Sequence, residues 1–423
     1  MVPHTPSVGL RSIAAVVAVL LVAVGCSSDP DGAGSPSPSA PSSALPTLST
    51  DGWAPETYQR LTTLIEANAN QNKVITFDWD NTIQARDVSE ATLAQSEANG
   101  TLTPGDVPKA LAPTFVADGK THSIKNGIVD YYEALTKVTK GDQGAYPSLA
   151  WAVQAYAGWT IEQLVDQTAN TYARGSGATD LATGKTTLIG KSDQARPFVY
   201  PQMADLLGYL ESRGYDVWVV SAGSAWAVRW MVINALNPAI REKYGDSAIH
   251  DPEKVVGVSD LTQDTRTLEM RSDQSMRLTG NARYFNLDPA ITSKLKITQI
   301  VDRTVSWSGG KVSAILETIG RNDLFMAAGD SDGDLYMLRF ADNQLLIGRL
   351  DKPDLEQVLA EGLSGGQDTV MVQPTFSRDH VGFLPNSCEV RNRTQSDPEL
   401  ATKAEASINT LNSKGWLPGF SSC

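Results

Sequence analysis

Histidine and cysteine are scarce in this chain, which has four histidines and three cysteines among 423 residues. The histidines, His4, His122, His250 and His380, are not spaced to form a zinc pair, and none lies near a serine elbow. Basic residues do not balance the acids, and the formal net charge of −13 argues against nucleic acid as a partner. These shortages leave small solutes as the expected partners.

The N-terminus predicts export. One arginine, Arg11, precedes an apolar run at residues 13–24, which is too short to span a bilayer comfortably. We therefore expect a signal peptide over residues 1–25. Ala23-Val24-Gly25-Cys26 resembles the lipobox of bacterial lipoproteins, although leucine is commoner at the position of Ala23. Lipid on Cys26 would anchor the protein to the outer face of the cytoplasmic membrane, whereas an ordinary signal peptide cleaved nearby is the alternative.

A tether and a disulfide are predicted next. Residues 26–52 are rich in Ser, Pro and Gly, cannot form a core, and should behave as a solvated tether before a folded region that begins near Trp53. Cys388 and Cys423 would meet oxidising conditions outside the cytoplasm, so we expect them to form a disulfide. A closed loop of about 35 residues would contribute roughly 3 to 4 kcal/mol on the chain-entropy estimate.

Four apolar segments predict a parallel sheet, because they alternate little between apolar and polar residues, as strands covered on both faces do. These segments are residues 74–78, 217–221, 324–330 and 344–348. Helical patterns precede three of them, at residues 56–68, 203–212 and 312–319. The alternation predicts an α/β fold with a doubly wound parallel sheet.

The length of the chain predicts one catalytic domain with an insertion. We assign residues 53–87 and 197–350 to the core, the mainly helical residues 88–196 to an inserted cap, and residues 351–423 to a C-terminal extension. The extension should contain a helix at 354–361, a strand at 370–372 and a terminal helix near 400–411. Residues 255–258 and 297–301 are also predicted to be strands, but the sequence does not indicate which strands they pair with. They suggest a small β-rich addition to the core.

Two carboxylates follow the first predicted strand. Asp78 and Asp80 are two residues apart on an extended chain, so they share a face and would repel unless a cation or a shared proton relieves them. Mg²⁺, a hard cation with a preference for oxygen, is the expected cofactor. At the end of the second strand, Ser221 and Ala222 would let a hydroxyl and backbone N–H groups approach a phosphate oxygen.

Two further pieces should reach the same edge of the sheet. Gly309-Gly310-Lys311 opens a helix and would place an ammonium there, with Lys294 and Lys296 as competing lysines. The acidic turn from Gly329 to Asp334 suits a hard cation, and Asp330 is its expected ligand. A competing phosphate-loop pattern at Gly184-Lys185-Thr186 fails because Thr179 stands where its first glycine belongs.

In this order the residues resemble the four motifs of the haloacid dehalogenase superfamily, in its phosphatase branch related to phosphoserine phosphatase. The resemblance covers roughly residues 73–350. It implies that Asp78 attacks phosphorus, that Asp80 protonates the leaving oxygen and then activates water, and that Thr82 lies beside the phosphate. It also implies that Asp78, the backbone carbonyl of Asp80, and Asp330 bind Mg²⁺. Asp334 would order metal-bound water, with Asp332 as the weaker alternative.

The cap should select the substrate. Asp87 stands at the position where phosphoserine phosphatases carry an acid that binds the substrate ammonium group. The alternative is that Asp87 belongs to a solvated hinge of the cap. Tyr132, Glu133, Trp151 and Trp159 offer acids and aromatic faces suited to a quaternary ammonium, although such aromatics more often pack in a core.

The spacing of these cap residues is similar to that of the exported phosphorylcholine phosphatases of bacteria. The resemblance implies hydrolysis of phosphocholine or a similar small phosphorylated amino alcohol. A solute-binding lipoprotein without catalysis, and a phosphotransferase with the same aspartyl-phosphate chemistry, are the alternatives. The intact acid pair argues against the solute-binding lipoprotein, since a binder gains nothing from a nucleophile beside a general acid.

Overall fold

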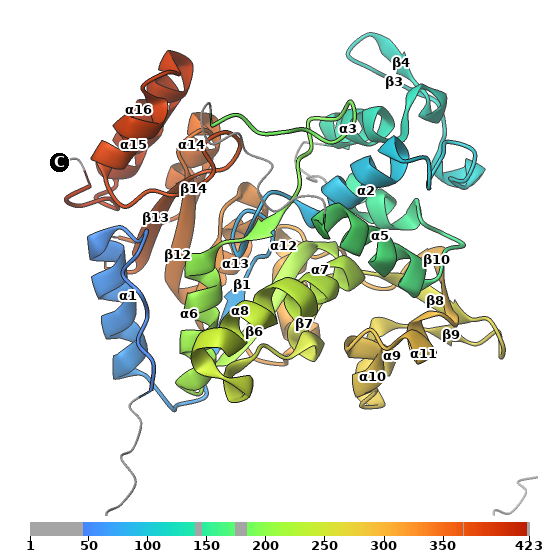
Figure 1. Ribbon diagram of the computed structural model, residues 1–423, viewed down its shortest axis with the longest axis horizontal. Helices are drawn as coiled ribbons and strands as arrows, with labels where there is room; N and C mark the ends of the chain where they lie inside the picture. The colour runs from blue at the N-terminus through green and yellow to red at the C-terminus, as the bar shows by residue number, and fades with distance from the viewer. Residues whose placement is uncertain (1–44, 140–145, 174–183, 367, 421–423) are drawn as a thin grey trace, which may run out of the picture. The chain divides into compact units, whose positions relative to one another are not determined.

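The computed structural model describes residues 45–139, 146–173, 184–366 and 368–420 (Figure 1). The chain divides into two units, Met1–Ala44 and Leu45–Cys423, and every described residue belongs to the second. The predicted signal peptide, Cys26, most of the tether and Cys423 therefore lie outside the described residues. Within the described residues, no helix is both long and apolar enough to cross a membrane.

A seven-stranded sheet forms the centre of the second unit, with the strand order β14-β13-β12-β11-β1-β6-β7. Neighbouring strands are parallel, except that β14 runs antiparallel to β13. The four strands predicted first are confirmed, as is the doubly wound α/β class. The strands are β1 (Val74–Phe77), β6 (Asp216–Ser224), β7 (Val255–Val258), β11 (Leu324–Gly329), β12 (Ala341–Arg349), β13 (Val370–Phe376) and β14 (Gly382–Phe383).

Helices cover both faces of this sheet. Along β1, Ile75 and Phe77 join the apolar cluster that contains α1 and α6, whereas Val74 joins the cluster that contains α12, α13 and α16. Burial on both faces explains why β1 shows no polar alternation. The predicted helices are all present, within one to three residues at each end. The helices of these layers are α1 (Pro55–Ala67), α6 (Pro201–Ser212), α7 (Ala225–Met231), α8 (Asn237–Tyr244), α12 (Gly309–Thr318), α13 (Leu335–Phe340), α14 (Pro353–Gly362), α15 (Ser387–Thr394) and α16 (Pro398–Ser413).

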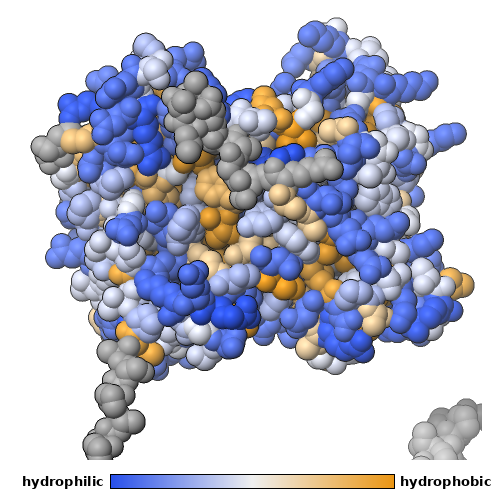
Figure 2. Space-filling view, in the orientation of Figure 1, coloured by the Kyte–Doolittle hydropathy of each residue, from blue (hydrophilic) through white to orange (hydrophobic). Residues whose placement is uncertain are grey.

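The predicted cap is a group of helices with a short hairpin, and a two-stranded ladder of β2 and β5 joins its entry to its exit. Figure 2 shows hydrophobic residues gathered near the centre of the visible face and hydrophilic residues over its outer parts. The elements are β2 (Gln84–Ala85), α2 (Val88–Ala98), β3 (Phe115–Ala117), β4 (Lys120–His122), α3 (Ile128–Thr139), α4 (Tyr146–Gln154), α5 (Ile161–Ala173) and β5 (Phe198–Val199).

A second inserted segment, residues 259–305, packs against the cap helices. Residues 255–258 form β7 of the main sheet, but residues 297–301 belong to a separate three-stranded sheet, β10-β8-β9. Its strand β10 pairs with the cap, because Gly158 N–H donates to Ile297 O and Ile297 N–H donates to Trp159 O, both at 2.8 Å. The segment contains β8 (Asp260–Asp264), β9 (Met270–Arg271), α9 (Asp273–Leu278), α10 (Ala282–Phe285), α11 (Pro289–Thr292) and β10 (Leu295–Val301).

The strand order places a ligand site beside β1. From β1 the chain continues to β6 and β7 on one side, and it later builds β11, β12 and β13 on the other. Ligands of open α/β sheets bind outside the carboxyl ends of the strands at such a switch point. The residues that follow β1 and β11 therefore lie where a ligand is expected.

Candidate active site

The turn after β1 brings two aspartates to the carboxyl edge of the sheet. Asp78 continues the strand pairing, since its N–H donates to the carbonyl of Ala328 at 2.9 Å. The chain then folds back, and the N–H of Gln84 donates to the carbonyl of Trp79 at 3.1 Å. Asn81 has a φ of 57°, in the left-handed region that asparagine tolerates better than most residues. This tight turn lets Asp78 and Asp80 come from one short segment.

Three buried carboxylates converge beside the turn: those of Asp78, Asp330 and Asp334, whose oxygen atoms lie within 4.8 Å of one another. Lys311, in the first turn of α12, pairs through Nζ with Asp78 Oδ1 and with Asp334 Oδ1, the latter at 2.6 Å. The hydroxyl of Thr82 lies 3.4 Å from Asp78 Oδ2 and 3.3 Å from Asp330 Oδ1. Residues from three of the predicted motif segments thus share one buried site.

The competing residues of the sequence analysis lie elsewhere. Asp332 is exposed, although it stands between two aspartates of the cluster. Lys296 is exposed on β10, and Lys294 is half-buried in the loop before that strand. Neither lysine forms an ion pair with the cluster among the described residues.

The cluster fits a small divalent cation. Its three carboxylates face two cationic side chains, Lys311 and Arg349, and the Arg349 guanidinium lies 2.9 Å from Asp330 Oδ2. Burial, and then the charge of Asp334, hold the pKa of Asp78 well above its ordinary value. Burial also raises the pKa of Asp330 to about 6. A bound cation would relieve this excess negative charge, and an all-oxygen donor set suits Mg²⁺.

Asp80 has a different environment from Asp78. Its Oδ1 accepts hydrogen bonds from Gln84 Nε2 at 2.6 Å and from the backbone N–H of Val88 at 2.8 Å. Burial, and then the nearby charges of Asp87 and Asp78, hold its pKa well above the ordinary value. A carboxyl group whose pKa is raised is better suited to hold a proton for a leaving group than an ordinary aspartate.

The end of β6 borders the same space. Gly223 N–H donates to the hydroxyl of Ser221 at 3.0 Å. A Cβ at Gly223 would lie 3.0 Å from Asp80 Oδ2 and 3.3 Å from Ser221 Oγ, so a side chain there would fill the space between them. Ala222 lies in β6 between these residues. Ser221 and Ala222 are thus beside Asp80, where a phosphate-binding group is needed.

A cavity of about 180 Å³ lies beside Asn81 of the turn and beside Arg349, and both acids and bases line it. Its acids are Asp87 and Glu90, at the start of α2, and Asp193. Its bases are Arg86, Arg349, Lys352 and Arg378. Burial, and then the charge of Asp87, raise the pKa of Glu90 to about 8. The cavity therefore offers both signs of charge to a ligand.

The residues predicted to select the substrate do not all line this cavity. Asp87 lines it and caps α2 by accepting from Glu90 N–H at 2.8 Å. Tyr132 reaches it indirectly, since its hydroxyl donates to Glu90 Oε1 at 2.8 Å. Glu133 lines a separate cavity of about 340 Å³, and burial raises its pKa to about 7.

The two predicted tryptophans pack against other aromatic rings. The ring of Trp151 is 5.2 Å from that of Tyr131, and its indole N–H donates to the carbonyl of Leu111. The ring of Trp159 is 5.1 Å from that of Tyr156. Neither tryptophan lines the 180 Å³ cavity.

Sequence reasoning missed three residues of the site. Arg349 directly follows the predicted strand 344–348, so a charge at the carboxyl end of a core strand was a usable signal. Glu90 lies one helical turn after Asp87, on the same face of a helix. Gln84 carries only a weak signal, a polar residue within an apolar segment.

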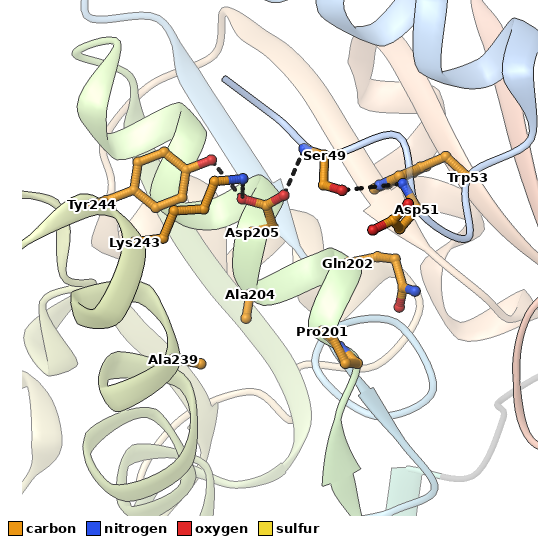
Figure 3. Close-up of a pocket in the computed structure, with 10 residues that line it drawn as sticks. All are labelled: Ser49, Asp51, Trp53, Pro201, Gln202, Ala204, Asp205, Ala239, Lys243 and Tyr244. Carbon is orange, nitrogen blue, oxygen red and sulfur yellow. Dashed lines mark hydrogen bonds and ion pairs between the residues drawn. The ribbon is translucent and has the colours of Figure 1, made fainter. Parts of the chain in front are cut away.

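Another cavity, of about 330 Å³, lies near the start of the described chain (Figure 3). Asp205 is central to it and accepts hydrogen bonds from Ser49 N–H at 2.7 Å and from Lys243 and Tyr244 at 2.6 Å each. Both carboxylate oxygens are therefore satisfied. None of the motif residues lines this cavity, so it does not belong to the candidate active site.

Cys388, in α15, is disulfide-bonded. Because Cys423 lies outside the described residues, its pairing with Cys388 stays a prediction. The predicted lipidation of Cys26 also lies outside them.

The chain is 30% identical over 291 residues to a phosphorylcholine phosphatase of Pseudomonas aeruginosa, a match that covers 68% of this chain and 76% of the relative. No family model matches it. Among solved structures, it is similar to a conserved protein of unknown function from Anaerococcus prevotii, with 19% identity, a TM-score of 0.49, and coverage of 81% of this chain and 97% of that one.

Two more distant structural neighbours have TM-scores of 0.35. One is a HAD family hydrolase from Salmonella enterica, with 12% identity over 74% of this chain and 77% of that one. The other is a phosphoserine phosphohydrolase-like protein from Francisella tularensis, with 16% identity over 76% of this chain and 98% of that one.

The parallel sheet, the Asp-x-Asp turn at its switch point and the lysine among buried aspartates define an enzyme of the phosphatase class. The sequence relationship to a phosphorylcholine phosphatase spans most of both chains and agrees with this site. The chain belongs to the haloacid dehalogenase superfamily of phosphatases. The family resemblance seen in the sequence is thereby confirmed.

Proposed function

We propose that the protein is a Mg²⁺-dependent phosphomonoester hydrolase that forms an aspartyl-phosphate and acts on phosphocholine or a similar small phosphorylated amino alcohol. The observation that carries this proposal is the placement of two aspartates from one turn in different environments. Asp78 contacts Lys311 inside the acidic cluster, whereas Asp80 stands apart with its own hydrogen-bond donors. A nucleophile and a proton donor need this separation of roles.

In the proposed reaction, a carboxylate oxygen of Asp78 attacks phosphorus as the bond from phosphorus to the alcohol oxygen breaks. Asp80 gives its proton to that oxygen, and the alcohol leaves. Water then attacks the phosphorus of the aspartyl-phosphate while Asp80 takes a proton from it, which restores both aspartates and releases phosphate. Ser221, the backbone N–H of Ala222, and Lys311 would hold the phosphoryl oxygens. Mg²⁺ held by Asp78, Asp330 and the Asp80 carbonyl would offset negative charge on the phosphoryl group.

The acidic side of the 180 Å³ cavity supports a cationic substrate. Asp87 and Glu90 form no ion pair among the described residues, and burial raises the pKa of both carboxyl groups. An ammonium group in the cavity would favour their charged forms. The relative from Pseudomonas aeruginosa is named for phosphorylcholine, which carries such a group.

The first test measures phosphate release from phosphocholine, glycerol phosphate and phosphoserine with and without Mg²⁺, using the tether-free protein and its Asp78→Asn variant. Mg²⁺-dependent release that disappears in Asp78→Asn, with phosphocholine preferred, supports the proposal. Equal turnover of phosphocholine and glycerol phosphate contradicts the proposed substrate but is compatible with the proposed mechanism. Transfer of phosphate to added glycerol at the expense of free phosphate would favour the phosphotransferase.

We also propose that the protein is exported and anchored through lipid on Cys26. The support is the apolar run before Ala23-Val24-Gly25-Cys26. Fatty-acid labelling in a bacterial host should mark the wild type and fail with Cys26→Ala, and the variant should leave the membrane fraction. A wild-type protein that is processed without label would instead favour an ordinary signal peptide.

A further inference from the structure

Gln84 is a buried amide that lies against the side chain of Asp80. It is the first residue of β2 and has no exposed surface. Its Nε2 lies 2.6 Å from Asp80 Oδ1 and 3.2 Å from the carbonyl oxygen of Arg86. The carbonyl oxygen of Arg86 can only accept a hydrogen bond, so the amide must turn its NH₂ group toward this oxygen and toward Asp80 Oδ1. Gln84 is therefore a donor to Asp80.

A second donor holds the same oxygen. The backbone N–H of Val88, the first residue of α2, donates to Asp80 Oδ1 at 2.8 Å. The two donors come from different points on the chain, so together they fix the orientation of the carboxyl group. Two N–H donors on Oδ1 also require that a proton on the neutral acid sits on Oδ2.

The other carboxyl oxygen of Asp80, Oδ2, is available to take part in the reaction. Within the part of the chain that the structure describes, no hydrogen bond is made to Asp80 Oδ2. It lies beside Gly223, where a Cβ would approach it to 3.0 Å, and the hydroxyl of Ser221 borders the same space. Oδ2 therefore faces the region in which the phosphate ester is expected.

We propose that Gln84 is a positioning residue that, together with the Val88 N–H, holds Asp80 Oδ1 so that Oδ2 delivers the proton to the leaving alcohol. This inference rests on the proposed hydrolysis of phosphomonoesters. When the bond from phosphorus to oxygen breaks, its electron pair stays on the alcohol oxygen, which takes the proton from Oδ2. The negative charge left on Asp80 is shared with Oδ1, where the two N–H groups stabilise it.

This role predicts that Gln84 matters only when the leaving oxygen needs a proton. Choline is an alkyl alcohol, which leaves poorly as an anion, so phosphocholine depends on Asp80. In p-nitrophenyl phosphate the leaving group is a stabilised phenolate, which departs without protonation. The value of kcat/KM is diagnostic, because it reports the steps up to formation of the aspartyl-phosphate.

The test compares Gln84→Met with the wild type, Asp80→Asn, and Gln344→Met as a matched control. Methionine keeps the length of glutamine and removes the donor. Gln344 is also a buried glutamine whose Nε2 donates to a carbonyl, that of Ala341, and like Gln84 it has an Oε1 without a partner among the described residues. Each protein is assayed with phosphocholine and with p-nitrophenyl phosphate.

For Gln84→Met we expect kcat/KM to fall about 10- to 100-fold with phosphocholine and less than about 3-fold with p-nitrophenyl phosphate, a part of the 10²- to 10⁴-fold that a general acid contributes. Asp80→Asn should show the same selectivity more strongly, and Gln344→Met should show none. Equal losses with both esters, or no loss with either, would overturn the proposal.

A crystal structure of Gln84→Met separates this inference from the proposed function. If the Asp80 carboxyl group rotates away from the Val88 N–H, Gln84 positions it, whatever the enzyme hydrolyses. An unmoved Asp80 would overturn the inference even if phosphocholine is the substrate. A wild type that releases no phosphate from any ester contradicts the proposed function, and the crystal structure then decides the role of Gln84 alone.

Discussion

Arg229 and Asp273 form a two-point ion pair in the interior, with Nη1 to Oδ1 at 2.6 Å and Nη2 to Oδ2 at 2.8 Å. Arg229 lies on α7, directly after β6, and Asp273 opens α9 of the second inserted segment. The guanidinium also donates to the carbonyl of Val255 in β7 at 2.9 Å. This pair therefore fastens residues 259–305 to the main sheet, next to β6, the strand that carries Ser221.

We predict that Asp273→Asn destabilises the protein by about 3 to 5 kcal/mol at pH 7, because it leaves a buried guanidinium without its carboxylate. Urea unfolding at pH 7 measures this change. Asp288→Asn is the matched control, since Asp288 forms an ion pair with Arg283 in the same segment but at the exposed surface. Its unfolding midpoint should stay close to that of the wild type. Equal shifts in both variants would contradict the prediction.

The same pair predicts acid sensitivity. Burial by itself raises the pKa of Asp273, but the charge and hydrogen bonds of Arg229 outweigh it and lower the pKa below its ordinary value. As pH falls, the unfolded chain therefore takes up the proton first. The stabilisation is complete above the unfolded pKa of about 3.9 and disappears as the pH falls through the lower folded value. The wild type and Asp273→Asn should accordingly lose their difference in stability under strongly acidic conditions.

Asp334 and Asp332 give a second prediction, about the metal. Asp334 is buried within the carboxylate cluster, and Asp332, two residues earlier, is exposed. We expect Asp334→Asn to weaken Mg²⁺ binding about 10- to 100-fold, as loss of a group that orients a metal site does, and Asp332→Asn to leave it unchanged. Isothermal titration with Mg²⁺ measures this without turnover. Equal Mg²⁺ affinity in both variants would remove Asp334 from the metal site.

The sheet and its motifs could be predicted because their signals are local. Each core strand carries its own apolar run, and Asp78 and Asp330 directly follow strands whose carboxyl ends must reach the same edge of the sheet. Asp78 and Asp330 therefore follow from order along the chain, and Lys311 follows from its place at the start of the helix that leads into β11. The same logic extends to Arg349, which ends β12 at that edge.

Residues 297–301 could be predicted as a strand, but the pairing of the second inserted segment could not. Its strand β10 carries polar residues such as Lys296, and its partners are β8 and the backbone of the cap near Gly158 and Trp159. Antiparallel pairing between distant segments depends on tertiary packing and leaves little trace in either sequence. The ion pair of Arg229 with Asp273 has the same character, because neither residue is unusual in its own segment.

A third prediction concerns the C-terminus. If Cys388 pairs with Cys423, the tether-free protein, which lacks Cys26, should show no thiol that reacts in denaturant. Reduction should then lower the free energy of unfolding by roughly 3 to 4 kcal/mol, the entropy of closing a loop of about 35 residues. Two reactive thiols in the unreduced protein would contradict the pairing.

The last prediction uses Glu90 to test the substrate. Because the pKa of its carboxyl group is raised to about 8, Glu90 is mostly neutral at pH 7 and becomes charged as the pH rises through 8. Only the charged form attracts an ammonium group. We therefore expect KM for phosphocholine to fall about tenfold between pH 7 and pH 9, which corresponds to about 1.4 kcal/mol of binding free energy. KM for glycerol phosphate should show no such fall, and phosphate ionisation affects both esters alike.

Glu90→Gln should abolish this pH dependence and keep KM for phosphocholine near its value at low pH. Asp260→Asn is the control, because burial raises the pKa of the Asp260 carboxyl group to about 8 as well, but Asp260 lies in β8 and does not line the 180 Å³ cavity. If Glu90→Gln keeps the pH dependence, the cavity beside Arg349 is not the site that binds the ammonium group. If KM for glycerol phosphate falls as much as KM for phosphocholine when the pH rises, the acids of the cap do not recognise the cationic group of the substrate.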